Sequence, residues 1–283
     1  MGPAPAYAES VLVVFSDLDG TLLDPATYDF SAAQPALDAL RKSAIPLVLV
    51  SSKTRAEMEH WRRRLGNAHP FVVENGGAIY APEGYFPFDL PGAVRRQGYQ
   101  VIEFGKPYAE LVHALEEAAK ETRTPVLGFY RMTVGQIRRR TALPLALARL
   151  AKQREYDEPF TISGKARPEP LLEALERRGL RWTRGGRFYH VLGDNDKARA
   201  ASTLIELYRR VHRNLRTVGL GDAWNDVSFL RLMDEAFLLL SPAAREIQAA
   251  VPGARITSAP GPWGWNEAVL SLLHAPPRSE MVP

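Results

Sequence analysis

The stretch VLVVFSDLDGT, residues 11–21, governs the interpretation of the rest of the chain. Its first five residues, Val11–Phe15, are too few for a helix, and their continuous apolarity is typical of a strand buried on both faces of a sheet. Two carboxylates, Asp17 and Asp19, follow directly. Because open parallel sheets bind ligands at the carboxyl ends of their strands, the stretch predicts a parallel sheet with a site at this edge. Taken alone, the two acids also fit a simple turn with capping side chains.

Short apolar runs alternate with helical patterns in other parts of the chain. We expect further strands at Ile45–Val50, Phe71–Val73, Phe188–Leu192, Thr217–Leu220 and Ala236–Leu240, and helices over 31–43, 54–65, 196–211 and after Asn225. The helix over 54–65 begins with the spacing of a capping box, Thr54 followed by Glu57. This alternation predicts an α/β fold with a Rossmann-like parallel-sheet core.

Between these segments the pattern loosens into a separate α+β module. It contains expected strands near Gln100–Phe104, Pro125–Tyr130 and Phe160, and expected helices over 107–121, 133–154 and 168–178. We therefore predict a core of residues 1–84 and 187–283 with an inserted domain of residues 85–186, hinged near Pro82–Pro91 and Gly179–Gly186. The insert holds 18 Lys or Arg against 12 acidic residues, which suits an anionic ligand.

Composition excludes several classes of protein. The 283 residues are 46% hydrophobic and 24% charged, which is ordinary globular usage and enough for two domains. The absence of Cys excludes a disulfide framework, a thiolate metal site and a cysteine nucleophile. Apolar runs fall short of the ~18 residues that a membrane span needs, and residues 1–10 lack the basic region of a signal peptide. We expect a cytoplasmic protein with no membrane partner.

The net charge of +4 raises the question of nucleic-acid binding. The longest basic clusters, Arg62–Arg64 and Arg138–Arg140, are more simply explained as solvated helix faces, so we expect no nucleic-acid partner. Arginine makes up 29 of the 36 basic residues, and this bias, with 22 Pro and no Cys, favours a heat-adapted source.

Polar residues follow other expected strands as well. Ser51-Ser52-Lys53-Thr54 follows the second strand, Gly221–Asp226 follows the strand at 217–220, and Asp194–Lys197 precedes a helix. If these strands are neighbours in a parallel sheet, a hydroxyl, a lysine and several carboxylates meet at one edge.

Carboxylates gathered in this way repel one another unless a cation neutralises them. An oxygen-only set with room for water is what Mg²⁺ prefers, so the sequence predicts a magnesium site. The expected ligands are Asp17, the backbone carbonyl of Asp19, and Asp222, with Asn225 and Asp226 supporting them.

These motifs resemble those of the haloacid dehalogenase-like (HAD) phosphohydrolases. Asp17–Thr21 resembles the nucleophile motif of that family, Ser51 its phosphate-binding hydroxyl, Lys197 its phosphate-binding lysine and Gly221–Asp226 its acidic metal motif. The inserted domain resembles the large cap of the sugar-phosphatase branch. More narrowly, five further segments resemble the mannosyl-3-phosphoglycerate phosphatases, namely 51–54, 74–77, 154–160, 185–188 and 261–266.

The resemblance implies a two-step hydrolysis of a phosphate monoester. Asp17 attacks phosphorus to give an aspartyl-phosphate, which water then hydrolyses. Asp19 protonates the leaving alkoxide and later takes a proton from water. Mg²⁺ lets the two anions approach, and Lys197 and Ser51 hold the remaining phosphoryl oxygens.

The partner so implied is a small-molecule sugar phosphate, and the inserted domain is expected to recognise it. The candidate substrate-binding residues are Ser51, Ser52 and Lys53 near the phosphate, Arg140, Arg154 and Arg187 for a carboxylate, and Glu74, Asn75 and Glu158 for hydroxyls. Each of these arginines fits a surface ion pair equally well. His190, in a strand-like run, is interpreted as a packed, hydrogen-bonded residue.

Three other functions remain open at this point. The chain fits a phosphatase for a different sugar phosphate, or a phosphomutase or phosphotransferase that passes the phosphoryl group to a sugar hydroxyl instead of water. A basic nucleic-acid-binding module is the non-enzymatic alternative, and it predicts affinity that falls steeply with salt.

Overall fold

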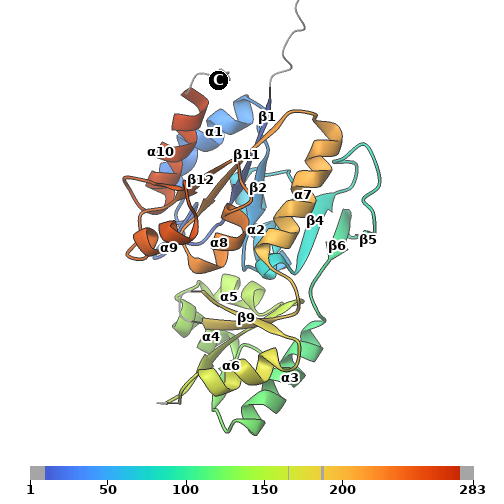
Figure 1. Ribbon diagram of the computed structural model, residues 1–283, viewed down its shortest axis with the longest axis vertical. Coiled ribbons are helices and arrows are strands. Elements are labelled where there is room, and N and C mark those ends of the chain that lie inside the picture. Colours follow the sequence, from blue (N-terminus) through green and yellow to red (C-terminus); the bar gives the residue numbers. More distant parts are fainter. Residues whose placement is uncertain (1–9, 165, 186–187, 275–283) are drawn as a thin grey trace, which may run out of the picture.

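The computed structural model of the chain describes residues 10–164, 166–185 and 188–274, which are built around two β-sheets (Figure 1). The larger sheet has nine strands in the order β13-β12-β11-β1-β2-β3-β4-β6-β5. Its parallel strands are β1 (Val11–Ser16), β2 (Leu47–Val50), β3 (Phe71–Val73), β11 (Leu215–Gly221), β12 (Glu235–Leu238) and β13 (Arg255–Ile256). Three antiparallel strands extend it, β4 (Ala78–Pro82), β5 (Val94–Arg96) and β6 (Tyr99–Glu103). The predicted α/β class is confirmed.

Helices cover both faces of this sheet (Figure 1). One face packs against η1 (Ser31–Ala33), α1 (Gln34–Lys42), α2 (Arg55–Leu65) and α10 (Gly261–His274), and the other against α7 (Lys197–Val211), α8 (Val227–Leu230) and α9 (Ala244–Ala250). In β1, Val14 joins the first apolar cluster, whereas Val13 and Phe15 join the second. Burial on both faces is the reason for the unbroken apolar run of this strand.

Helix α2 begins as the capping box predicts. Thr54 Oγ1 accepts a hydrogen bond from Glu57 N at 3.2 Å, and Glu57 Oε2 accepts one from Thr54 N at 3.0 Å. The helix ends at Gly66, whose left-handed φ of 60° lets the chain turn away. The cap fixes the start of the helix next to the polar residues that follow β2.

The smaller sheet is antiparallel, in the order β7-β8-β10-β9, and its strands are β7 (Val126–Gly128), β8 (Asp157–Ile162), β9 (Arg181–Gly185) and β10 (Phe188–Leu192). On one face lie α3 (Tyr108–Glu121) and α6 (Glu169–Glu176). On the other lie α4 (Val134–Thr141) and α5 (Leu145–Ala151), between this sheet and the larger unit (Figure 1). We call the smaller unit the cap and the larger unit the core.

The predicted division of the chain at 84/85 and 186/187 does not follow the pairing of the strands. Strands β5 and β6 belong to the core sheet, because β6 pairs antiparallel with β4. Strand β10, expected in the core, pairs with β8 and β9 of the cap. The periodicity of a strand indicates how it is buried but not which neighbour it pairs with, and this is the source of the error.

The chain passes between the two units at other positions than predicted. It crosses at residues 104–107, between β6 and α3, and at 193–196, between β10 and α7. The predicted hinge near Pro82–Pro91 lies within the core, between β4 and β5, and the one near Gly179–Gly186 lies along β9, whose described residues end at Gly185. Among the helices of the described residues, none is both long enough and apolar enough to span a membrane.

Two glycines of the core allow the cap to approach closely. A Cβ at Gly77 would lie 2.4 Å from Tyr156 Cβ, and one at Gly105 would lie 2.7 Å from the same atom. Tyr156 is buried here, in the segment that leads into β8. Because a Cβ is fixed to its backbone, Tyr156 cannot rotate out of the way.

The substitution Gly77→Ala is therefore expected to destabilise the protein by about 1–3 kcal/mol, the usual penalty for overpacking. Urea unfolding measures the change in the free energy of unfolding. The matched control is Gly135→Ala in α4, where the nearest atom would be 3.7 Å from the added Cβ. We expect unchanged or slightly higher stability for the control. Equal stability of both variants would contradict the close contact at Tyr156.

Candidate active site

Two neighbouring core strands end in acidic residues at the edge of the sheet that faces the cap (Figure 1). Asp17 follows β1 and Asp222 follows β11, and Asp17 N donates to the carbonyl of Leu220 at 3.0 Å. Thr21 Oγ1 donates to Asp222 Oδ1 at 2.9 Å. Gly20, with a φ of 78°, passes so close that a Cβ there would lie 2.4 Å from Asp222 Oδ2. A glycine is thus required in the turn that brings the two acids together.

A buried lysine lies between two of the acids. Lys197, the first residue of α7, places Nζ 2.6 Å from Asp17 Oδ1 and 2.6 Å from Asp226 Oδ1. Burial by itself would lower the pKa of Lys197, but the ion pairs with Asp17 and Asp226 more than offset this and raise the pKa above its usual value. The ammonium group is therefore charged throughout the physiological pH range.

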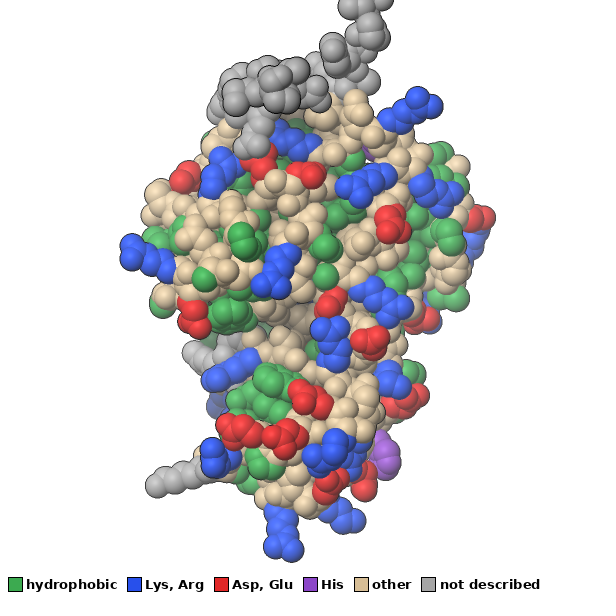
Figure 2. Space-filling model, viewed as in Figure 1, with side chains coloured by type: hydrophobic (Ala, Val, Ile, Leu, Met, Phe, Trp, Pro, Cys, Tyr) green, Lys and Arg blue, Asp and Glu red, His purple; other side chains and the backbone are tan. Residues whose placement is uncertain are grey.

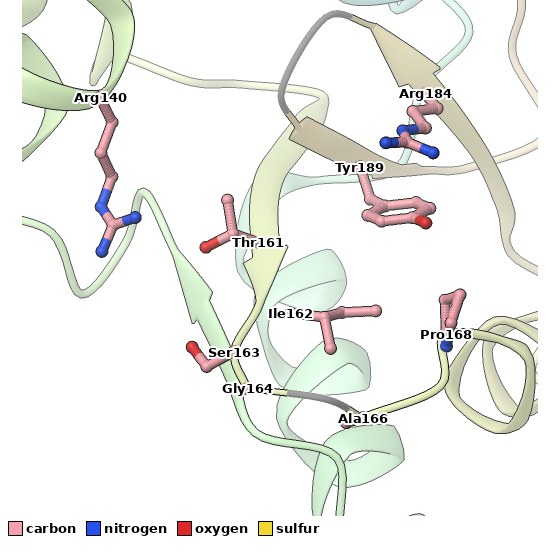
Figure 3. Close-up of a pocket in the computed structure, with 9 residues that line it drawn as sticks. All are labelled: Arg140, Thr161, Ile162, Ser163, Gly164, Ala166, Pro168, Arg184 and Tyr189. Carbon is pink, nitrogen blue, oxygen red and sulfur yellow. The ribbon is translucent and has the colours of Figure 1, made fainter.

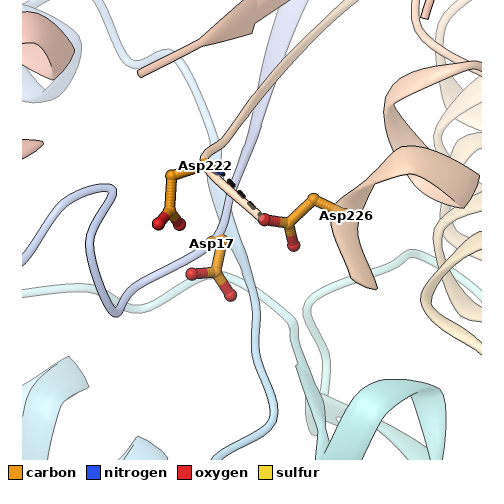
Figure 4. Close-up of side chains that lie close together, drawn as sticks. All are labelled: Asp17, Asp222 and Asp226. Atoms are coloured by element: carbon orange, nitrogen blue, oxygen red, sulfur yellow. Dashed lines mark hydrogen bonds between the residues drawn. The ribbon is translucent and has the colours of Figure 1, made fainter. Parts of the chain in front are cut away.

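Three carboxylates gather around this edge of the sheet (Figure 4). One oxygen from each of Asp17, Asp222 and Asp226 lies within 4.8 Å of the others. Burial raises the pKa of Asp17 to about 7, because the attraction of Lys197 only partly offsets it and Asp226 and Asp19 repel the charge. Burial, and repulsion from Asp226 and Asp17, also raise the pKa of Asp222. One ammonium does not neutralise this cluster.

The donor set fits a hard divalent cation, since it consists of three carboxylates whose charge the single ammonium of Lys197 does not balance. Asp226 takes a supporting position. Its Oδ1 faces Lys197, and its Oδ2 accepts the backbone N–H groups of Asp222 and Ala223, each at 3.1 Å (Figure 4). Asp17 and Asp222 are therefore the carboxylates best placed to bind a cation directly.

The second acid of the DLDGT stretch has a separate partner. Asp19 Oδ2 lies 2.7 Å from Lys53 Nζ, and the Asp19 side chain is 42% exposed, whereas that of Lys53 is buried. The other oxygen, Asp19 Oδ1, is a buried atom with no hydrogen-bond partner among the described residues. Asp19 Oδ1 is thus an acceptor that can take a hydrogen bond or a proton from a ligand in the cavity.

The residues after β2 form the adjoining wall. Ser51 is buried, and its Oγ accepts a hydrogen bond from Lys53 N at 3.3 Å. Ser52 and Lys53 line the cavity described next. Their backbone is held by the segment after β3, because Glu74 N donates to Lys53 O at 3.0 Å and Asn75 N to Ser51 O at 3.1 Å. Of the predicted residues, Lys53 contacts Asp19 and Lys197 contacts Asp17 and Asp226 directly, while Ser51 lies two residues before Lys53 in the adjoining wall.

A cavity of about 550 Å³ lies between core and cap, and Asp17, Asp19 and Asp222 line it. Core and cap both contribute to its wall, which includes Asp17, Asp19, Ser52, Lys53, Asp222 and Asn225 from the core and Phe129, Arg140, Leu143, Arg154, Phe188 and His190 from the cap. The volume is in the range of small-molecule sites. A ligand here is enclosed by charged groups at one end and by mixed apolar and basic groups at the other.

Glu74 lies at the junction of core and cap and does not line this cavity. Its carboxylate accepts backbone N–H groups of the cap, from Glu155 at 3.0 Å, Tyr156 at 2.9 Å and Asp157 at 2.9 Å, and Arg154 Nε lies 3.4 Å away. Burial raises the pKa of Glu74 to about 8 despite the attraction of Arg154. Glu74 was predicted to bind a hydroxyl group, but its carboxylate instead holds the cap on the core.

Asn75 also joins the two units. Its Nδ2 donates to Asp157 Oδ2 of the cap at 2.8 Å, and its Oδ1 accepts from Asn225 Nδ2 at 3.2 Å. Asn225 lies in the acidic motif after β11 and is one of the two residues that the sequence predicts to support the metal ligands. Both Glu74 and Asn75 have left-handed φ angles, 47° and 55°, which is unusual for residues other than glycine.

The three predicted arginines lie in different environments. Arg154 is buried, lines the cavity, pairs with Asp157, and donates from Nη2 to Ser52 O at 3.0 Å. Arg140 lines the cavity and also borders a second pocket of about 600 Å³ on the cap strands, toward which it points in Figure 3. Arg187 lies outside the described residues. Of the set, Arg154 and Arg140 are the two that the structure brings to the cavity.

Glu158, the last predicted hydroxyl-binding residue, lies behind the cavity wall. It accepts a hydrogen bond from Tyr108 at 2.5 Å and one from the backbone N–H of Tyr130 at 3.2 Å. Burial raises the pKa of Glu158 to about 7. Its side chain joins α3 to the cap sheet and is absent from the cavity lining.

Several lining residues were not among the predicted site. Tyr28 and Phe129 supply aromatic surface, and Glu57 lines the cavity in addition to capping α2. His190 is buried and hydrogen-bonded, as interpreted from the sequence, but it also lines the cavity. Glu57 has a local signal, its position four residues after Lys53 in the capping box, whereas Phe129 and His190 reach the cavity only through the way the cap sits on the core.

Comparisons with known proteins agree with the geometry. Residues 14–89 match the family model of the haloacid dehalogenase-like hydrolases. Over 263 residues the chain is 38% identical to the glucosyl-3-phosphoglycerate/mannosyl-3-phosphoglycerate phosphatase of Methanococcoides burtonii, which covers 92% of this chain and 97% of that protein. Over 229 residues it is 41% identical to the mannosyl-3-phosphoglycerate phosphatase of Pyrococcus furiosus, covering 81% and 91%.

Solved structures share the fold at lower identity. A phosphatase of the haloalkanoate enzyme superfamily from Bacteroides thetaiotaomicron matches with a TM-score of 0.66 and 18% identity, covering 96% of this chain and 98% of that one. At this identity the likeness concerns the arrangement of core and cap only.

The raised pKa of Glu158 predicts a pH dependence of stability. The folded protein keeps this carboxyl protonated up to about pH 7, whereas the unfolded chain releases the proton near the ordinary 4.5. Stability from Glu158 is thus present below about pH 4.5 and is lost as the pH rises to about 7. In Glu158→Gln this loss is absent, so between pH 5 and pH 8 the variant should gain about 2.5 kcal/mol relative to the parent.

Urea unfolding of both proteins at the two pH values measures this difference. Glu173→Gln, at an exposed position of α6, is the matched control and should follow the parent at both pH values. A constant difference between Glu158→Gln and the parent across the two pH values would contradict the raised pKa.

Proposed function

The chain belongs to the haloacid dehalogenase-like hydrolases and is a phosphatase of that family, as its motifs predicted. We propose that it hydrolyses mannosyl-3-phosphoglycerate or glucosyl-3-phosphoglycerate, and that the reaction passes through an aspartyl-phosphate. The products are the glycosylglycerate and inorganic phosphate. The observation that supports this best is that Asp17, Asp19 and Asp222 line one cavity between core and cap, while the buried ammonium of Lys197 pairs with Asp17.

Asp17 acts as the nucleophile in this proposal. A carboxylate oxygen of Asp17 bonds to phosphorus while the ester bond from phosphorus to the glycerate oxygen breaks, and Asp19 gives its proton to the departing oxygen. In the second step water bonds to the same phosphorus and loses a proton to Asp19. The bond from phosphorus to Asp17 then breaks, which restores both residues and releases phosphate.

Lys197 and Ser51 hold the phosphoryl group. Lys197 is already fixed by Asp226, so its ammonium stays in place while Asp17 changes from carboxylate to acyl phosphate. This preorganisation matters, because phosphate monoester hydrolysis requires very large accelerations and a single positioned donor supplies only about 3 kcal/mol. Lys53 holds Asp19 beside the leaving oxygen.

Mg²⁺ is the proposed cofactor, with Asp17, the backbone carbonyl of Asp19 and Asp222 as its protein ligands and Asn225 and Asp226 as their supports. When bound, the cation neutralises the acid cluster and the phosphoryl oxygens, so that one anion can approach another. The close, buried arrangement of Asp17, Asp222 and Asp226 supports this part of the proposal, because burial and mutual repulsion raise the pKa values of Asp17 and Asp222 and a bound cation would relieve both effects.

The proposed substrate rests on the activities for which the two relatives are named and on the cavity. A glycosylated phosphoglycerate has a phosphate, a carboxylate and several hydroxyls. The core end of the cavity offers groups for the phosphate, and Arg140 and Arg154 offer donors for the carboxylate. On the face shown in Figure 2, Lys and Arg alternate with Asp and Glu and do not form one basic surface, so this face does not favour the nucleic-acid alternative.

A phosphate-release assay with Mg²⁺ tests substrate and cofactor together. We expect kcat/KM for mannosyl- or glucosyl-3-phosphoglycerate to exceed that for simple hexose phosphates by at least about tenfold, a difference worth only about 1.4 kcal/mol. EDTA should abolish the activity and excess Mg²⁺ restore it. Equal rates on all sugar phosphates would contradict the substrate, and transfer of phosphate to a second sugar would favour the phosphomutase alternative.

The substitution Asp17→Asn tests the covalent step. Because the amide is a poor nucleophile, we expect turnover to fall by at least about 10³-fold, while Mg²⁺ still binds weakly through the remaining ligands. Asp38→Asn, at an exposed position of α1, is the control and should keep full activity. Near-normal phosphate release by Asp17→Asn would remove the aspartyl-phosphate from the proposal.

A further inference from the structure

His190 lies where the cap sheet borders the cavity. It belongs to β10, its side chain is 9% exposed, and it lines the cavity together with the neighbouring residue of that strand pair, Pro159. Its Nδ1 lies 2.9 Å from Asp157 Oδ2. Nε2 is the ring nitrogen that does not contact Asp157, and none of the catalytic steps proposed above uses it.

Asp157 is suited to hold this ring in one orientation. It is completely buried at the start of β8, where Arg154 pairs with its Oδ1 and Asn75 Nδ2 donates to its Oδ2 at 2.8 Å. Burial alone would raise the pKa of Asp157, but Arg154 and His190 lower it below the usual value. An ionised carboxylate can only accept hydrogen bonds, so His190 donates from Nδ1–H. In the neutral ring Nε2 is then an acceptor.

An acceptor at this position complements the other polar groups of the cap. Arg140 and Arg154, which line the same part of the cavity, can only donate hydrogen bonds. A hydroxyl group of a sugar both donates and accepts, and it binds best where it meets both kinds of partner. A ring fixed by a buried carboxylate offers its acceptor without loss of side-chain freedom on binding.

We propose that His190 is a specificity-determining residue that accepts a hydrogen bond at Nε2 from a hydroxyl of the sugar part of the substrate, with Asp157 as the positioning residue that fixes the ring. This inference rests on the proposed phosphatase function and adds to it the group that recognises the sugar. The hydrogen-bonded chain continues from Asp157 through Asn75 to Asn225 of the acidic motif. Sugar recognition thus depends on the same contacts that seat the cap on the core.

Two substitutions separate the roles of the ring nitrogens. In His190→Asn the amide Nδ2 takes the place of Nδ1 and keeps the bond to Asp157, but no atom replaces Nε2. In His190→Gln the amide reaches the position of Nε2 and the bond to Asp157 is lost. His113→Gln, at an exposed position of α3 on the far side of the cap sheet, is the matched control.

The readout is the ratio of kcat/KM for the glycosyl phosphoglycerate to kcat/KM for p-nitrophenyl phosphate, which has no hydroxyls. We expect His190→Asn to lower this ratio about tenfold, mainly through a higher KM for the glycosyl phosphoglycerate, with the melting temperature unchanged. His190→Gln should keep more of the ratio but melt at a lower temperature, and His113→Gln should match the parent in both respects.

The inference is overturned if the ratio for His190→Asn equals that of the parent, whether both kcat/KM values are unchanged or both fall by the same factor. Failure of the proposed function is seen separately, in the parent enzyme alone, as a lack of preference for the glycosyl phosphoglycerates. In that case the sugar phosphate that the parent prefers takes their place in the ratio. A parent with no preference for any sugar phosphate over p-nitrophenyl phosphate overturns both proposals.

Discussion

The ammonium group of Lys197, buried between the carboxylates of Asp17 and Asp226, is the contact on which the site depends. Two acids share one base, and Asp222 adds a third acid nearby. Removing charges from water is expensive, and breaking a buried pair by deleting one partner typically destabilises a protein by 3–5 kcal/mol. The fold tolerates this arrangement because Asp226 also receives two backbone N–H groups, which fix it as the rigid member.

The interface between cap and core combines two kinds of contact. One part of it is apolar, where α5 packs against α2 within one buried cluster. Beside the site it is a buried polar network of Glu74, Asn75, Arg154 and Asp157. Apolar surfaces tolerate small shifts, whereas buried charges and amides are satisfied in only one arrangement. The network therefore determines the orientation of the cap, and the apolar contact contributes area.

The sequence predicts the core of the site well, because parallel strands place their carboxyl ends at one edge. Asp17, Ser51 and Asp222 each follow a strand of that sheet, and Lys197 begins a helix beside it. The cap is predicted less well. The local periodicity of a sequence does not show which strands pair. The prediction therefore placed β6 in the cap and β10 in the core, whereas the structure shows the reverse. Glu74 and Glu158 were expected to face a ligand, but an acid that faces a backbone N–H has the same local sequence as one that faces a sugar.

Backbone strain links the phosphate end of the cavity to the cap. Glu74 and Asn75 hold consecutive left-handed conformations, each of which costs about 1–3 kcal/mol and persists only where the surroundings enforce it. Their N–H groups bind the carbonyls of Lys53 and Ser51, while their side chains bind the cap. The side chain of Asn75 is fixed by one hydrogen bond to Asp157 of the cap and one to Asn225 of the core. Displacement of the cap would remove the first of these two contacts. The strained pair therefore makes the phosphate-binding backbone and the seating of the cap one cooperative unit, and a cap displaced from the core would also release the support of Ser51.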